Sequence, residues 1–148
     1  MRKTALYGTL AAVAVTAGNV LHGVSHAGVG VPLAAWQRAY VYLVIFLAPV
    51  VAAVLLWGRF RRAGAWLLAG SMAGSLAFGV AYHFLIPGPD NALTLQPGAW
   101  QTAFRASAAL LVLLDGLGLV VGIWAARKFS RGAGEPGPTG GLAETEAR

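Results

Sequence analysis

Three histidines are the residues of this chain whose side chains could ligate a metal ion or a haem. His22 and His26 are four positions apart and Asn19 precedes His22 by three, so a helix would place them along one face. His83 belongs to a separate apolar segment. Imidazoles from two facing helices can hold a haem through its axial positions, or zinc or copper with a third ligand. We therefore take His22, His26 and His83 as candidate metal ligands, and His22 and His83 as candidate cofactor-binding residues.

The same histidines also fit a structural role. In that alternative His26 lies at the water interface, while His22 and His83 hydrogen-bond to each other, to Tyr82 or to Asn19. A quinone or lipid headgroup site is a further alternative. The spacing of the histidines alone does not decide among these roles, because no carboxylate within their own spans stands out as a second-shell partner.

Asp115 is the one acidic residue inside an apolar run. Its distance from the basic residues that follow places it near the middle of a membrane, at a depth comparable with Ser71 and Ser75. Desolvation there favours the neutral carboxyl, which we expect to donate to a hydroxyl or carbonyl of a neighbouring helix. The alternatives are a proton or cation relay and a partner on another subunit.

The elements that position these residues follow from where charge is absent. The chain of 148 residues is 57% hydrophobic and 11% charged, a composition typical of proteins whose solvent is lipid. Four apolar runs with almost no charged residues cover about 4–26, 36–57, 63–86 and 100–126. Each run has roughly 20 residues or more, enough for a helix to cross about 30 Å of hydrocarbon. All five tryptophans fall at the ends of these runs, where indoles anchor membrane helices. The prediction is an all-α integral membrane protein with four transmembrane helices in an up-down bundle.

Basic residues predict the orientation of the helices. They cluster before the first run, between the second and third, and after the fourth, at Arg2, Lys3, Arg59, Arg61, Arg62, Arg127, Lys128 and Arg131. By the positive-inside rule both termini face the cytoplasm, which predicts a multi-pass protein of the cytoplasmic (inner) membrane. The net charge of +6 is then a topology signal and an attraction to anionic lipid. It leaves no basic surface for a nucleic acid, so the lipid bilayer is the expected partner.

Both ends of the chain carry a separate prediction. Residues 130–148 are rich in Gly, Pro and Glu without apolar periodicity, so we expect a disordered cytoplasmic tail after a transmembrane domain at 1–129. The first run has an alternative reading as a cleaved signal peptide ending at Ser25-His26-Ala27, which would leave three spans. Its length and its buried Asn19 and His22 argue against cleavage.

An internal similarity suggests two repeated hairpins. Residues 35–40 and 99–104 both read Ala-Trp-Gln-x-Ala-aromatic, and each hexamer follows a connection that contains Pro and Gly. Both hairpins would start on the same side, as in a parallel repeat. The first and third helices would then lie diagonally across the bundle. The alternative is that two helix starts converged on a tryptophan anchor.

Small residues predict close helix packing. Gly70 and Gly74 in the third run, and Gly118 and Gly122 in the fourth, have the four-residue spacing that lets two helix backbones approach in lipid. The same spacing also fits a homo-oligomer face or a partner in a membrane complex. Pro49 predicts a kink in the second helix.

Enzyme signatures such as a nucleophile elbow, a zinc-protease helix or a phosphate-binding loop are missing from the sequence. The absence of cysteine excludes disulfides, thiolate metal sites and covalently attached haem. The first hypothesis is a non-enzymatic structural or accessory membrane subunit. The second is a redox or sensor protein that binds haem or a divalent metal through the histidines. The third is a small proton-coupled transporter that uses Asp115.

Overall fold

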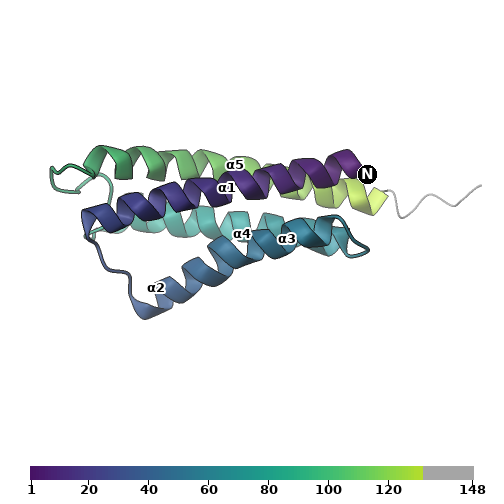
Figure 1. The fold of residues 1–148 in the computed structure, drawn as a ribbon, viewed down its shortest axis with the longest axis horizontal. Coiled ribbons are helices and arrows are strands. Elements are labelled where there is room, and N and C mark those ends of the chain that lie inside the picture. Colours follow the sequence, from purple (N-terminus) through teal and green to yellow (C-terminus); the bar gives the residue numbers. More distant parts are fainter. Residues whose placement is uncertain (132–148) are drawn as a thin grey trace, which may run out of the picture.

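The computed structural model describes residues 1–131, and this part of the chain is all-helical (Figure 1). The first helix is α1 (Arg2–Val29), and the fourth is α5 (Gln101–Arg131). The second helix contains α2 (Ala35–Tyr40), the wide π-helical segment η1 (Val41–Leu47) and α3 (Ala48–Leu56). The third contains α4 (Arg61–Val80) and a second π-helical segment, η2 (Ala81–Leu85). The predicted tail lies outside the described residues, except for Ser130 and Arg131, which belong to α5.

Neighbouring helices run in opposite directions and form a bundle (Figure 1). Helix α5 packs most extensively against α4 and α1, and α3 packs against α4 and α1. The first and third helices make few contacts with each other, and the second and fourth make fewer still, so both pairs are diagonal, as in an up-down four-helix bundle with or without a repeat. We call the end with Met1, the turn at 57–60 and Arg131 the terminal end. The opposite end, with the connections 30–34 and 86–100, is the histidine end (Figure 1).

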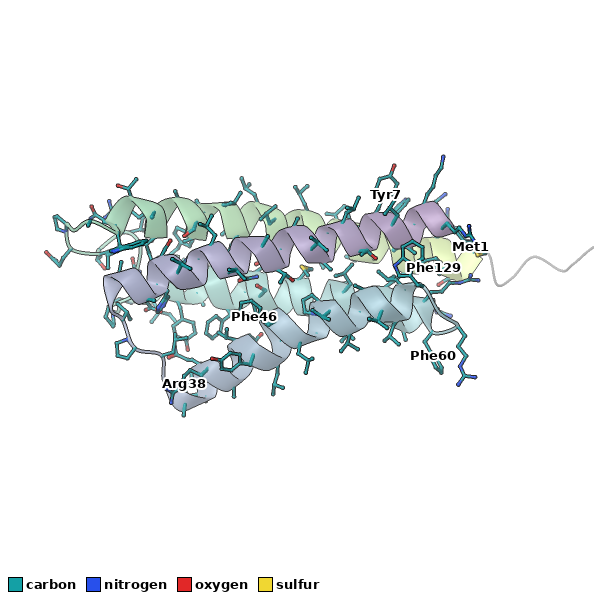
Figure 2. All side chains as sticks on the ribbon, viewed as in Figure 1. Met1, Tyr7, Arg38, Phe46, Phe60 and Phe129 are labelled. Atoms are coloured by element: carbon teal, nitrogen blue, oxygen red, sulfur yellow. The ribbon has the colours of Figure 1, made fainter. Side chains whose placement is uncertain are left out.

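All four helices are long and apolar enough to cross a membrane. Large apolar side chains cover the outside of the bundle, and Val54, Leu113 and Leu117 are each at least 65% exposed. The fourth helix continues past the predicted end at 126, because Phe129 is buried in the apolar core at the terminal end (Figure 2). The absence of charge therefore predicted the apolar part of this helix and not its full length.

Glycines bring helices together at several of the predicted positions. A Cβ on Gly122 would lie 2.7 Å from the backbone nitrogen of Ala69, so α5 and α4 touch backbone to backbone there. Gly118 lies against the side chain of Met72, and Gly74 against Tyr40 of the second helix. Gly70 is exposed, and a Cβ there would meet nothing within 4 Å in the described part of the chain. Gly70 therefore makes no helix contact within the described residues.

The second helix leaves the bundle at the histidine end. Its η1 segment ends just before Ala48 and Pro49, and wide turns and prolines are the common causes of helix bends. Beyond them α2 diverges from α1 (Figure 1), and Arg38 lies at its far tip (Figure 2). Contact with the third helix persists through Tyr40, whose ring stacks on Phe78 with centroids 4.9 Å apart. Four residues of the second helix, Arg38, Val41, Ile45 and Phe46, line a cavity that is described below.

Candidate functional site

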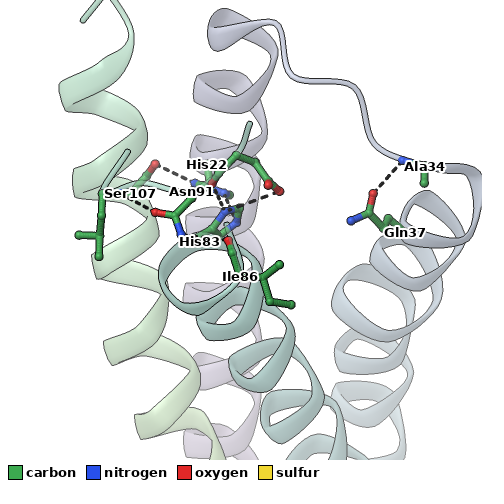
Figure 3. A network of polar contacts seen from close by, with 9 residues as sticks. His22, Ala34, Gln37, His83, Ile86, Asn91 and Ser107 are labelled. Atoms are coloured by element: carbon green, nitrogen blue, oxygen red, sulfur yellow. Dashed lines mark hydrogen bonds and ion pairs between the residues drawn. The ribbon is translucent and has the colours of Figure 1, made fainter. Parts of the chain in front are cut away.

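His22 and His83 meet inside the histidine end (Figure 3). Their Nε2 atoms are 3.1 Å apart, and both residues are buried. The Nδ1 atom of His22 lies 3.0 Å from the Ser107 hydroxyl of α5, and the Nδ1 atom of His83 lies 2.9 Å from the backbone carbonyl of Asp90. The Asp90 carboxylate is 4.0 Å from the same His83 nitrogen. One hydrogen-bonded chain therefore connects α5, α1, η2 and the 86–100 connection.

This chain of hydrogen bonds has two forms that differ by one proton. If Ser107 donates to the Phe104 carbonyl, 3.1 Å away, His22 donates to Ser107 from Nδ1 and His83 donates to the Asp90 carbonyl, so the bond between the two Nε2 atoms needs one extra proton on either imidazole. When His83 holds that proton, its ring faces the Asp90 carboxylate. If Ser107 instead donates to His22, every bond is satisfied with both imidazoles neutral. The geometry can therefore hold one extra proton without losing the histidine pair.

The connection after the third helix fixes His83 and Asp90 in place. The amide of Ala92 donates to the His83 carbonyl at 2.8 Å, and the Asn91 side chain donates to the Ile86 carbonyl at 3.0 Å. Arg105 of α5 donates to the carbonyls of three residues of the connection, Ala92, Leu93 and Leu95. The His83 carbonyl is available for this bond because the helix ends at Leu85, so the helix itself supplies no donor for the carbonyls of its last turn.

His26 lies beside this pair and leaves one nitrogen without a partner. The ring centroids of His26 and His83 are 6.1 Å apart, and the ring of the fully buried Phe104 lies within 5.5 Å of all three histidines. Nε2 of His26 is buried but has no hydrogen-bond partner among the described residues. The three predicted histidines therefore come together around one phenylalanine.

The geometry does not support the predicted haem or metal site. A haem with two axial histidines must lie between the imidazoles, and a direct hydrogen bond between His22 and His83 leaves no room for it. Within residues 1–131, no group of three or more His, Asp or Glu side chains is arranged to hold a metal ion. The observed contacts of His22 and His83 are those of the structural alternative.

Asp115 lies deeper in the bundle and is 2% exposed. The Ser75 hydroxyl of α4 donates to its Oδ2 atom at 2.8 Å. The partner is thus a hydroxyl on a neighbouring helix, as we predicted, but the carboxyl accepts rather than donates. Its Oδ1 atom is buried and has no partner in the described part of the chain. The other predicted intramembrane polar residues bond within their own helices: Asn19 to the Val15 carbonyl and Ser71 to the Leu68 carbonyl.

A cavity of about 320 Å³ connects the histidine cluster with Asp115. It occupies the space left where the second helix diverges, and Arg38, Val41, Ile45 and Phe46 line that side. Besides Arg38, its polar lining comes from the other helices and the 86–100 connection: Asn19, His22, His26, Ser75, His83, Asp90 and Asp115. The remaining walls are mainly aliphatic and aromatic. The cavity can therefore hold a molecule that is mostly apolar and carries a few hydrogen-bonding groups.

Three parts of the site were not predicted. Ser107 and Phe104 precede Asp115 by 8 and 11 residues, so helical periodicity would have placed both on the buried face of α5 with Asp115. The place of Arg38 in the lining was also not predicted, because no sequence signal revealed the cavity beside it.

Comparison of the chain with protein-family models, with curated proteins and with solved structures found no match. The function is therefore argued from the site alone.

Proposed function

We propose that this chain is a four-span protein of the cytoplasmic membrane with both termini in the cytoplasm. The length and hydropathy of its four helices support insertion. The fold gathers the basic flanks of the helices, including Arg2, Arg59 and Arg131, at the terminal end. The histidine end carries only Arg38 and Arg105 among the described Lys and Arg residues. The positive-inside rule then places the terminal end in the cytoplasm.

The orientation can be tested with single cysteines, because the chain contains none. Gly58 lies in the turn at the terminal end and Gly98 in the 86–100 connection, and a Cβ has room at both positions. In intact cells a membrane-impermeant maleimide should label Gly98→Cys, and should label Gly58→Cys only after permeabilisation. The opposite pattern would reverse the proposed orientation.

The first helix is retained in this proposal and is not removed as a signal peptide. It is packed along its length, from Ala5 and Val15 to Ser25, and it supplies His22 to the buried pair. Cleavage after Ala27 would remove that whole interface. The intact mass of protein isolated from membranes should therefore include residues 1–27, and a mass that lacks them would exclude the four-span proposal.

The function that we infer is binding of a small, mainly apolar molecule, as a non-enzymatic binding or accessory subunit of the membrane. One observation carries this inference. The two buried side-chain atoms without a partner in the described chain, His26 Nε2 and Asp115 Oδ1, belong to residues that line the same cavity.

A purely structural bundle gives no reason for this coincidence. An unpartnered polar atom in an apolar interior costs free energy, and a bundle without a ligand would be more stable with apolar residues at both positions. A ligand with polar groups offsets that cost when it binds. A cavity of about 320 Å³ is also within the usual range for small-molecule sites.

The test is to fill the cavity without disturbing the helices. Gly79 lines the cavity and a Cβ there meets nothing within 4 Å, so Gly79→Leu should occupy the space. Gly116→Leu is the matched control, because this glycine also has open space around it but does not line the cavity. Equilibrium dialysis of 4-phenylbutanol against protein in nanodiscs, with empty nanodiscs to subtract lipid partitioning, measures binding.

We expect saturable binding to the unaltered protein and to Gly116→Leu, and loss of binding in Gly79→Leu at an unchanged unfolding temperature. Binding that is unaffected by Gly79→Leu would show that the probe does not occupy this cavity. Uptake no greater than in empty nanodiscs would count against a ligand-binding function.

A further inference from the structure

Asp115 is a buried acid with no Lys, Arg or His nitrogen within 4.0 Å of its carboxyl oxygens in the described part of the chain. One carboxyl oxygen accepts from Ser75 and the other faces no donor among the described residues. Within residues 1–131 the charge pair of His83 with Asp90 is the one contact between a basic and an acidic side chain within 4.0 Å. Asp115 therefore depends on something outside the described chain to balance an ionised carboxylate.

The surroundings of Asp115 limit what that partner can be. A carboxylate in an apolar interior is costly unless a cation or hydrogen bonds compensate it. The neighbouring cavity walls are apolar, with Phe46, Phe78, Leu111 and Val112 among them. A hydrated inorganic cation would lose its water against these walls without gaining enough oxygen ligands in return. An organic cation brings its own apolar surface, and aromatic rings also attract cations.

We propose that the cavity binds a lipophilic amine, whose ammonium group donates a hydrogen bond to Oδ1 of Asp115. Ser75 continues to donate to Oδ2, so that both carboxyl oxygens are satisfied. The apolar body of the amine lies against the aliphatic and aromatic walls. This inference rests on the proposed ligand-binding function and adds the chemical class of the ligand.

Three probes that share one apolar group separate the contributions of positive charge and of hydrogen-bond donation to the affinity. The first is 4-phenylbutylamine, which carries a positive charge and N–H donors at neutral pH. The second is its N,N,N-trimethyl derivative, which keeps the charge without the donors, and the third is 4-phenylbutanol, which has a donor without charge. Equilibrium dialysis in nanodiscs should rank the affinities as amine above trimethylammonium and alcohol, with the amine tighter than the alcohol by about a hundredfold.

The Asp115→Asn variant tests whether Asp115 is the residue that favours the amine over the alcohol. It keeps the size of the side chain and can still accept from Ser75, but it cannot carry a negative charge. We expect amine affinity to fall to that of the alcohol, while alcohol affinity stays within a factor of about two. Asp90→Asn is the comparison at the other acid that lines the cavity, which already faces His83; it should lower the amine affinity much less than Asp115→Asn does.

The possible outcomes distinguish failure of the amine assignment from failure of the proposed ligand-binding function. If amine and alcohol bind equally and Gly79→Leu blocks both, the cavity binds ligands but the amine assignment is wrong. If Asp90→Asn rather than Asp115→Asn removes the preference for the amine, the cation lies at the histidine end. If no probe binds above empty nanodiscs, both proposals fail. Should Asp115→Asn not fold, the ratio of amine to alcohol affinity in the unaltered protein decides.

Discussion

The two ends of the bundle bury different kinds of residue. At the terminal end the core consists of small and aliphatic side chains with Phe129, and glycines such as Gly8 and Gly64 let helices touch closely. At the histidine end the interior holds imidazoles, hydroxyls and carboxyls, and the second helix diverges to leave a cavity. The first arrangement keeps helices together. The second leaves polar atoms that can serve a ligand.

The difference indicates that the terminal end stabilises the bundle, whereas the histidine end provides the candidate binding site on the same helices. Apolar surface gives little net attraction between helices in lipid, so close packing of small residues must hold the bundle together. Once the terminal end supplies that packing, the histidine end tolerates unpartnered atoms such as His26 Nε2 and Asp115 Oδ1. Substitutions at the two ends should therefore have different consequences.

The largest effect should come from Gly122→Leu, which breaks the close contact at the terminal end. Its Cβ would lie 2.7 Å from a backbone nitrogen of α4, and a backbone cannot move aside as a flexible side chain can. We expect the free energy of unfolding to fall by about 3 kcal/mol or more.

Reversible unfolding in mixed micelles, followed by circular dichroism, measures this loss. Gly116→Leu is the control on the same helix, because its Cβ meets nothing within 4 Å, and it should change stability by less than about 1 kcal/mol. Equal losses in the two variants would mean that the close approach of α4 and α5 does not hold the bundle together.

A smaller effect is expected from the histidine pair. His22→Leu removes a partner from both His83 and Ser107, which should cost about 1–3 kcal/mol because two buried polar groups lose a bond. The double variant His22→Leu/His83→Leu should lose less stability than the two single variants lose together. We expect a coupling energy of about 1 kcal/mol.

His26→Leu is the matched control for this cycle, because the unpartnered Nε2 of His26 has no bond to lose within the described chain. Its effect on stability should be the smallest of the three histidines. Strict additivity of the His22 and His83 losses would show that the two imidazoles do not depend on each other.

Much of the terminal end could be predicted from sequence, because it depends on local pattern. Runs without charge gave four helices, and glycine spacing gave Gly118 and Gly122 as packing positions. Gly70 had the same spacing but lies on the exposed face, because spacing alone does not reveal which side of a helix meets its neighbour.

The histidine end depends on tertiary structure, so the sequence could give its residues but not their contacts. The sequence placed His22 and His83 in two separate apolar segments, but only the packing of their helices brings the two imidazoles into contact. The cavity depends on the wide turns of η1 and on the departure of α2. Pro49 predicted a kink in this helix, but the direction of the bend and the wide turns have no clear sequence signature. Ser107 is the exception, because its helical spacing from Asp115 indicates the same buried face of α5.

The smallest predicted effect compares two serines one turn apart on α4. Ser75 donates to Asp115 on α5, whereas Ser71 donates to the Leu68 carbonyl within its own helix. Ser75→Ala should cost about 0.6 kcal/mol, the usual size of an interhelical hydrogen bond in a membrane protein. Ser71→Ala should be neutral, because its backbone acceptor already belongs to the helix.

Unfolding in mixed micelles measures the difference in stability between the two variants. Ser75→Ala should also weaken binding of 4-phenylbutylamine several-fold, because the carboxyl that receives the ammonium loses the hydroxyl that orients it. A loss of stability in Ser71→Ala that equals the loss in Ser75→Ala would mean that contact across the helices is not what distinguishes these two hydroxyls.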